Sequence, residues 1–138
     1  MSKKKIVIIG GKLQGLEACY LSMKAGIEVT LIDKDPEAPA RDMATRFICE
    51  DVLGGSKEVM ETLDSADMVL PTMENYEVLE GLDELSVMMG FIYAFDIDAY
   101  RISSSKKRSD RLFHANSQHL IRAGCRLHWK QQEESKKL

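Results

Sequence analysis

The chain has 138 residues, of which 44% are hydrophobic and 30% are charged, and its formal net charge is −3. This balance fits one globular domain with a hydrophobic core and excludes an intrinsically disordered chain. No apolar run approaches the roughly 18–20 residues of a membrane span. The run after the basic start, Ile6 to Ile9, is too short for a signal peptide. We therefore expect a cytoplasmic protein that has no membrane segment.

The cysteines and the charges narrow the function classes further. The three cysteines lie far apart and form no Cys-x-x-Cys pair, which favours reduced thiols over a zinc site or disulfides.

Charge is distributed unevenly along the chain. Residues 1–100 carry 9 Lys and Arg against 19 Asp and Glu, whereas residues 101–138 carry 10 Lys and Arg against 3 Asp and Glu. A basic segment can bind nucleic acid, but only Phe113 and Trp129 are aromatic there. Contact with the phosphates of a small nucleotide, or plain solvent exposure, explains this segment better.

The first third of the chain predicts a strand, a turn, a helix and a second strand. A β-branched run over 5–9 is typical of a strand buried on both faces. Glycines mark a turn over 10–15, and apolar spacing predicts a helix over 16–25 that ends before Gly26. A second strand follows over 28–32. These elements form a βαβ unit, whose parallel crossover should be right-handed.

The same alternation continues along the chain and predicts an α/β fold. Alternating strands and helices indicate a doubly wound parallel sheet of the Rossmann-like type. Ser56 is a candidate helix cap. The further predicted strands are 46–49, 68–70 and 90–95, and the further predicted helices are 41–45, 56–63, 76–85, 96–101 and a segment from 106 onward.

Polar side chains follow four successive predicted strands. Lys12 and Gln14 follow the first strand, Asp33 the second, Asp51 the third and Glu74 the fourth. In a doubly wound sheet, ligands bind beyond the carboxyl ends of the strands, which meet at one edge. The sequence therefore predicts a ligand site at this edge, although each acid alone also fits a solvated loop residue.

The turn after the first strand only partly matches the dinucleotide-binding pattern Gly-x-Gly-x-x-Gly. Gly10 and Gly15 match, but Lys12 occupies the place of the middle glycine. A lysine crowds a pyrophosphate there, yet it adds positive charge beside a helix N-terminus. The turn thus indicates an anion site unlike the usual NAD or FAD site, or else a tight turn with a surface lysine. Asp33 fits a ribose-binding acid and a simple strand end equally well.

A set of segments distributed along the chain matches a known family in order and spacing: 8–22, 24–26, 31–34, Pro36, 47–52, 66–67, 70–71, 74–75 and 95–107. Together they resemble the ligases of pyrrolysine biosynthesis, ATP-grasp enzymes that join 3-methylornithine to lysine. The resemblance covers about residues 5–113, and the run 98–106 is its most distinctive part.

The resemblance implies a Rossmann-like pre-ATP-grasp domain at 1–103, followed by a linker and the start of a truncated ATP-grasp region at 104–125. The polar composition of 126–138 predicts a disordered tail. It implies that ATP and Mg²⁺ activate a carboxylate as an acyl phosphate, which the side-chain amine of L-lysine then attacks. No residue of the chain is assigned as a metal ligand or as catalytic. The matching positions are ATP contacts at Lys12, Asp33, Asp51, Val52 and Lys106, and L-lysine contacts at Leu13, Gln14 and Glu74.

After Phe113 the chain departs from the family pattern, and no proline follows Pro71. The lobes expected to hold adenine, Mg²⁺ and the acyl phosphate are missing. We therefore expect an N-terminal fragment, inactive alone, that arose by truncation, a frame change or a split gene, with a homodimer or a complementing chain as possible partners. Two other interpretations stay open: a nucleotide-sensing module without catalysis, and an interaction domain with a degenerate site.

Overall fold

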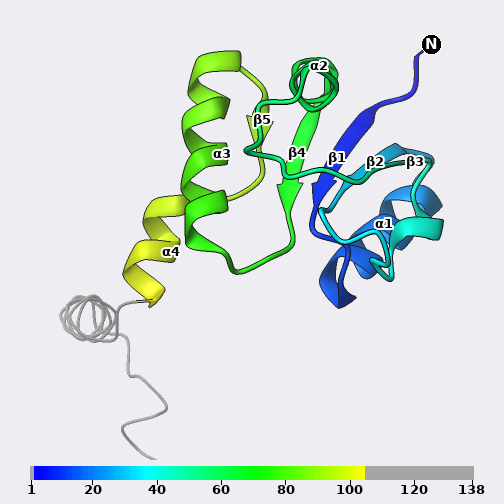
Figure 1. The fold of residues 1–138 in the computed structure, drawn as a ribbon, viewed down its shortest axis with the longest axis horizontal. Helices are drawn as coiled ribbons and strands as arrows, with labels where there is room; N and C mark the ends of the chain where they lie inside the picture. Colours follow the sequence, from blue (N-terminus) through cyan, green and yellow to red (C-terminus); the bar gives the residue numbers. More distant parts are fainter. Residues whose placement is uncertain (1, 105–138) are drawn as a thin grey trace, which may run out of the picture. The chain divides into compact units, whose positions relative to one another are not determined.

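The computed structural model of the chain describes residues 2–104. This part contains one five-stranded sheet in the order β3-β2-β1-β4-β5, and every neighbouring pair is parallel. The predicted doubly wound α/β fold is confirmed (Figure 1). The strands are β1 (Lys5–Ile9), β2 (Glu28–Ile32), β3 (Arg46–Ile48), β4 (Met68–Pro71) and β5 (Ile92–Tyr93).

Helices cover both faces of the sheet. On one face, α1 (Leu13–Lys24) packs against β1 and β2. On the other face lie α2 (Lys57–Ser65) and α3 (Tyr76–Met89), as Figure 1 shows. The predicted cap at Ser56 is confirmed, because its side chain accepts a hydrogen bond from the Val59 N–H at 3.3 Å. A short 3₁₀ turn, η1 (Arg41–Met43), precedes β3, and α4 (Ile97–Ser104) follows β5.

The alternation of side chains along β1 divides the core in two. Val7 and Ile9 point toward α2 and α3, whereas Ile6 and Ile8 point toward α1 and the buried Cys19. Burying each such side chain contributes about 1.5–3 kcal/mol, so β1 anchors both layers. Burial also raises the pKa of the Cys19 thiol, which remains a neutral core group.

The structure corrects several predicted boundaries. The first helix begins at Leu13, three residues before the predicted start at Leu16. The helix that begins at Tyr76 continues to Met89, and Gly90 is its C-cap, so the predicted strand over 90–95 shrinks to Ile92–Tyr93. The predicted helix over 96–101 extends from Ile97 to Ser104.

The chain divides into two units, Met1–Ile97 and Asp98–Leu138. The sheet, both core clusters and the predicted strand-end residues lie in the first unit. In the second unit, Arg101 forms an ion pair with Asp98 at 3.2 Å. Nearly all of the predicted segments 104–125 and 126–138 lies outside the described residues, and the boundary at residue 103 stays a prediction.

Within residues 2–104, no helix is both long and apolar enough to cross a membrane.

Candidate functional site

The first residues after three adjacent strands meet at the carboxyl edge of the sheet. Ile9, the last residue of β1, pairs with Ile32 on β2 and with Pro71 on β4. Gly10, Asp33 and Thr72 directly follow these three strand ends and are therefore neighbours in space. Because β1 lies between β2 and β4, the turn that leaves β1 is flanked by side chains from both sides.

These neighbours hold the peptide group between Gly10 and Gly11 at both ends. The Thr72 hydroxyl donates to the Gly10 carbonyl oxygen at 2.6 Å. The Asp33 carboxylate accepts the Gly11 N–H at 2.7 Å, and its other oxygen accepts the Asp35 N–H at 2.9 Å. Gly10 has φ +100°, a conformation that side-chain-bearing residues rarely adopt. The turn is thus fixed by specific hydrogen bonds.

The turn delivers the open N-terminus of α1 to the same edge. Lys12 is the N-cap residue, makes no side-chain cap hydrogen bond, and is followed by no acidic residue in the first turn. Gly15 lets α1 begin this early, because a Cβ there would lie 2.0 Å from the Gly10 carbonyl oxygen. The free N–H groups and the helix dipole favour a negatively charged group at this end.

Two adjoining cavities open at this edge. The larger one has a volume of about 930 Å³ and the smaller about 360 Å³. Both are lined by Asp33, Lys34, Met73 and Asn75, which form the boundary between them. The larger cavity is also lined by Gly10, Lys12, Leu13, Gln14, Thr72, Glu74 and Tyr76, and the smaller by Ile9, Ile32, Glu50, Asp51, Val52, Leu53, Glu77 and Val78.

The structure brings seven of the eight predicted site residues to these cavities. The three residues predicted to bind lysine all line the larger cavity, together with Lys12. Asp51 and the buried Val52 line the smaller one, and Asp33 lines both. Lys106 lies outside the described residues. Their roles as contacts stay predictions.

Sequence reasoning missed residues that share these walls. Lys34 follows Asp33 and lines both cavities, and Thr72 follows Pro71 at the end of β4. Their signal was available, because each lies at a strand end on the predicted edge. At the end of the second strand the prediction kept only Asp33, and a threonine after a proline resembles an ordinary loop residue.

The side chains at this edge fall into two groups, those that stabilise the loops and those that are available to a ligand. Asp51 accepts the Leu53 N–H at 3.0 Å, and Glu50 accepts the Ser56 hydroxyl at 2.6 Å. By contrast, the side chains of Lys12, Gln14, Lys34 and Glu74 form no hydrogen bond or ion pair with any residue in the described range 2–104. The second group is exposed and is therefore free to meet a ligand.

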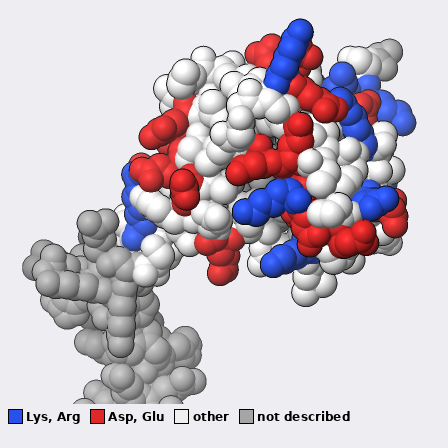
Figure 2. Space-filling view, in the orientation of Figure 1, with Lys and Arg blue, Asp and Glu red and all other residues white. Residues whose placement is uncertain are grey.

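The two linings differ in charge. In the larger cavity Lys12 and Lys34 balance Asp33 and Glu74, whereas in the smaller cavity Lys34 alone faces four acids, namely Asp33, Glu50, Asp51 and Glu77. Figure 2 shows acidic and basic side chains interleaved, with no uniformly basic face in that view. Across the described residues, no three or more His, Cys, Asp or Glu side chains are grouped so that they could hold a metal ion. The larger cavity therefore offers Glu74 to an ammonium group and Lys12 to an anion, and the smaller cavity suits a polyphosphate only with added cations.

In structure, the chain is similar to part of several solved enzymes that are less than 25% identical to it in sequence. It superposes on N5-carboxyaminoimidazole ribonucleotide synthetase from Thermotoga maritima with a TM-score of 0.62 and 22% identity, covering 82% of this chain and 31% of that one. The synthetase from Staphylococcus aureus, solved with ADP, gives a TM-score of 0.64 at 19% identity, covering 83% and 31%. These likenesses establish the fold.

In sequence, the chain is similar to 3-methyl-D-ornithine–L-lysine ligases. It is 44% identical to the ligase of Methanosarcina barkeri over 110 residues and 43% identical to that of Methanosarcina acetivorans. Each alignment covers 80% of this chain and 30% of the relative, so the chain spans about a third of these ligases, at their N-terminal part. The resemblance found in the sequence is confirmed for that part. No family model matches the chain.

Proposed function

We propose that the chain forms one wall of the ligand site of an ATP-dependent ligase that joins 3-methylornithine to the side-chain amine of L-lysine in pyrrolysine biosynthesis. The observation that carries this proposal is the convergence of Leu13, Gln14 and Glu74 on one cavity beside Lys12. The relatives named above supply the reaction, and the chain spans 30% of their length. The remaining walls come from the rest of the enzyme, on the same chain or on a partner.

The larger cavity is the proposed lysine side. Glu74 has an available carboxylate, which favours an ammonium group through a charge-assisted hydrogen bond. Leu13 is 72% exposed, and it offers an apolar surface to the four-carbon stem of lysine. Gln14 carries both a donor and an acceptor for the polar end of an amino acid. The charged residues of this lining balance, with Lys12 and Lys34 against Asp33 and Glu74, so the preference for an ammonium group rests on the available Glu74 carboxylate.

The smaller cavity and the α1 N-terminus are the proposed nucleotide side. Lys12 brings a positive charge next to free backbone N–H groups, which favours a phosphate. Val52 offers an apolar contact at the smaller cavity, beside Asp51 and Asp33. A volume of about 360 Å³ accommodates only part of a nucleotide. We propose that Lys106, Mg²⁺ and its ligands in the rest of the enzyme balance the remaining phosphate charge.

In the proposed reaction, an oxygen of the 3-methylornithine carboxylate attacks the γ-phosphorus of ATP, and ADP leaves. The deprotonated side-chain amine of lysine then attacks the acyl carbon, and phosphate leaves as the amide forms. The residues of this chain bind and orient: Glu74 holds lysine, and Lys12 holds a phosphate group. Such positioning supplies a large share of the rate enhancement in bimolecular ligations. The free thiols of Cys19 and Cys49 fit a reducing, cytoplasmic setting.

Calorimetric titration of the chain with ATP, ADP, NAD and L-lysine tests this function. The proposal expects lysine to bind, ADP to bind when Mg²⁺ is present, and NAD to fail, because the net negative smaller cavity suits phosphates only with added cations. A nucleotide-sensing module binds a nucleotide tightly without binding lysine, and a degenerate interaction domain binds none of the four. Glu74→Gln should weaken lysine binding and spare ADP, whereas Glu84→Gln, on an exposed part of α3, should change neither. Equal loss of both ligands with Glu74→Gln contradicts the assignment.

A further inference from the structure

We propose that Asp33 and Thr72 form a pair of positioning residues that together fix the Gly10–Gly11 peptide, and that the Asp33 carboxylate acts on the turn and is not the reader of a ribose hydroxyl. The pair thereby aims residues 12–14 at the ligand. This inference rests on the proposed function, because it concerns the same cavity.

The first argument is the geometry of one peptide group. Its carbonyl oxygen, on Gly10, accepts the Thr72 hydroxyl at 2.6 Å, and its N–H, on Gly11, donates to Asp33 at 2.7 Å. A peptide between two glycines rotates easily, because neither side has a Cβ to restrict it. The two hydrogen bonds hold the carbonyl oxygen and the N–H from opposite sides. They therefore fix the orientation of a peptide group that would otherwise rotate.

The second argument is that the carboxylate of Asp33 is already engaged. One oxygen accepts the Gly11 N–H and the other accepts the Asp35 N–H. A carboxylate that accepts two backbone N–H groups stabilises a loop strongly, since hydrogen bonds to charged groups are the stronger kind. Asp33 is half-buried, whereas the available ligand-facing groups are exposed. Its environment is that of a loop-stabilising residue.

The third argument is that Thr72 links two segments that line the larger cavity, the loop after β4 and the turn after β1. Thr72 lies two residues before Glu74, and its hydroxyl also lies 3.0 Å from the Ile9 carbonyl oxygen. The Thr72 N–H donates to the same Ile9 oxygen at 2.8 Å. Thr72 therefore ties the loop that carries Glu74 to the turn that carries Lys12. Loss of its hydroxyl should loosen both sides of the cavity together.

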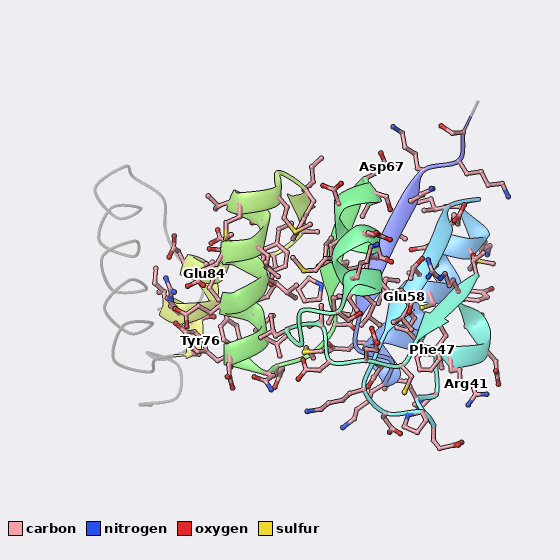
Figure 3. All side chains as sticks on the ribbon, turned by 45° about the horizontal axis from the view of Figure 1, so that its top comes forward. Arg41, Phe47, Glu58, Asp67, Tyr76 and Glu84 are labelled. Carbon is pink, nitrogen blue, oxygen red and sulfur yellow. The ribbon has the colours of Figure 1, made fainter. Side chains whose placement is uncertain are left out.

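The test uses Thr72→Val, which keeps the shape and removes the hydroxyl, and Thr72→Ser, which keeps the hydroxyl. Asp33→Asn leaves one acceptor for two N–H donors. The matched controls lie away from the cavities. Thr62→Val removes a hydroxyl that donates to the Glu58 carbonyl at 2.7 Å within α2. Asp67→Asn alters a carboxylate that accepts the Lys5 N–H at 2.8 Å, at the end of the sheet away from Tyr76 (Figure 3).

Two readouts are measured on the 138-residue chain: the exchange rate of the Gly11 amide by NMR, and the affinities for L-lysine and ADP. Thr72→Val and Asp33→Asn should each speed Gly11 exchange and weaken lysine binding by roughly tenfold. Thr72→Ser should keep the Gly11 exchange rate and the lysine affinity of the unaltered chain. The two control variants should also leave both quantities unchanged.

The outcomes separate this inference from the proposed function. Unchanged Gly11 exchange in Thr72→Val, or failure of Thr72→Ser to restore it, overturns the positioning pair. Loss of ADP binding in Asp33→Asn with Gly11 exchange unchanged shows that the carboxylate meets the nucleotide directly, and it also overturns the inference. If the unaltered chain binds neither ligand, the proposed function of this wall fails, while Gly11 exchange still decides whether the pair fixes the turn.

Discussion

Replacing Gly15 with alanine places a methyl group where the turn has no space. Its Cβ would lie 2.0 Å from the Gly10 carbonyl oxygen, whereas ordinary contact begins near 3.4 Å, so the two groups must separate by 1.4 Å. Overpacking of this kind costs about 1–3 kcal/mol. Moving the carbonyl also weakens its hydrogen bond from Thr72, at about 0.5–1.5 kcal/mol. Because alanine has a higher helix propensity than glycine, the substitution also stabilises the helix by at most about 1 kcal/mol.

The middle of these ranges gives a net loss of about 2 kcal/mol in the free energy of unfolding. For a unit of this size, that corresponds to a fall in Tm of about 8–16 °C. Thermal and urea unfolding followed by circular dichroism measure both quantities. Because the displaced carbonyl belongs to the turn before Lys12, the variant should also lose lysine affinity.

Gly81 supplies a matched control within a second helix. A Cβ at Gly81 would lie 2.8 Å from Leu53 Cδ2, the far end of a flexible side chain. Its other methyl carbon, Cδ1, would lie 3.0 Å away, so the end of the Leu53 side chain must shift, and the cost of that shift offsets the gain in helix propensity of up to about 1 kcal/mol. Gly81→Ala should therefore change the free energy of unfolding much less than Gly15→Ala, where the clash is with backbone. A loss below about 0.5 kcal/mol for Gly15→Ala, or equal losses for the two variants, would refute the close approach at the turn.

The remaining predictions concern the assembled enzyme, the chain alone and one helix cap. In the full-length ligase, Lys12→Ala should weaken ATP use and Glu74→Gln lysine use, each by roughly ten- to a hundredfold in kcat/KM; a change in the wrong substrate sinks the assignment. The 138-residue chain alone should release no ADP from ATP with both amino acids, because it spans 30% of its relatives; release above a protein-free control contradicts this. Ser56→Ala should destabilise the chain by about 1 kcal/mol in urea unfolding, through loss of the α2 cap, and an unchanged midpoint argues against that cap.

The strands and helices were predictable where the signals are local. The β-branched run at Ile6–Ile9 and the cap at Ser56 act within a few residues, and both appear as predicted. The start of α1 was not predictable, because it depends on the fit of Gly15 beneath the Gly10 carbonyl. The length of β5 depends on pairing with β4, which limits it to Ile92–Tyr93.

The edge that carries the candidate site was predictable because topology alone brings parallel strand ends together. Which side chains at this edge stabilise loops and which remain available to a ligand was not predictable. Asp33 and Glu74 are both acids after strands, yet Asp33 accepts two backbone N–H groups and Glu74 bonds to no residue of the described range. The bond from the Asp35 N–H to Asp33 is local, but the bond from the Gly11 N–H depends on a backbone position 22 residues away. Sequence spacing does not encode that choice.

Amide chemical-shift mapping of the chain with L-lysine and then with ADP tests the central claim most directly. The account predicts that lysine perturbs the amides of Leu13, Gln14 and Glu74, which line the larger cavity. It predicts that ADP perturbs Asp51 and Val52 at the smaller cavity, together with Lys12 at the N-terminus of α1, which lines the larger cavity. Perturbations confined to residues outside both cavities, or identical sets for the two ligands, would contradict the assignment of Leu13, Gln14 and Glu74 to the amine and of Lys12 and the smaller cavity to the nucleotide.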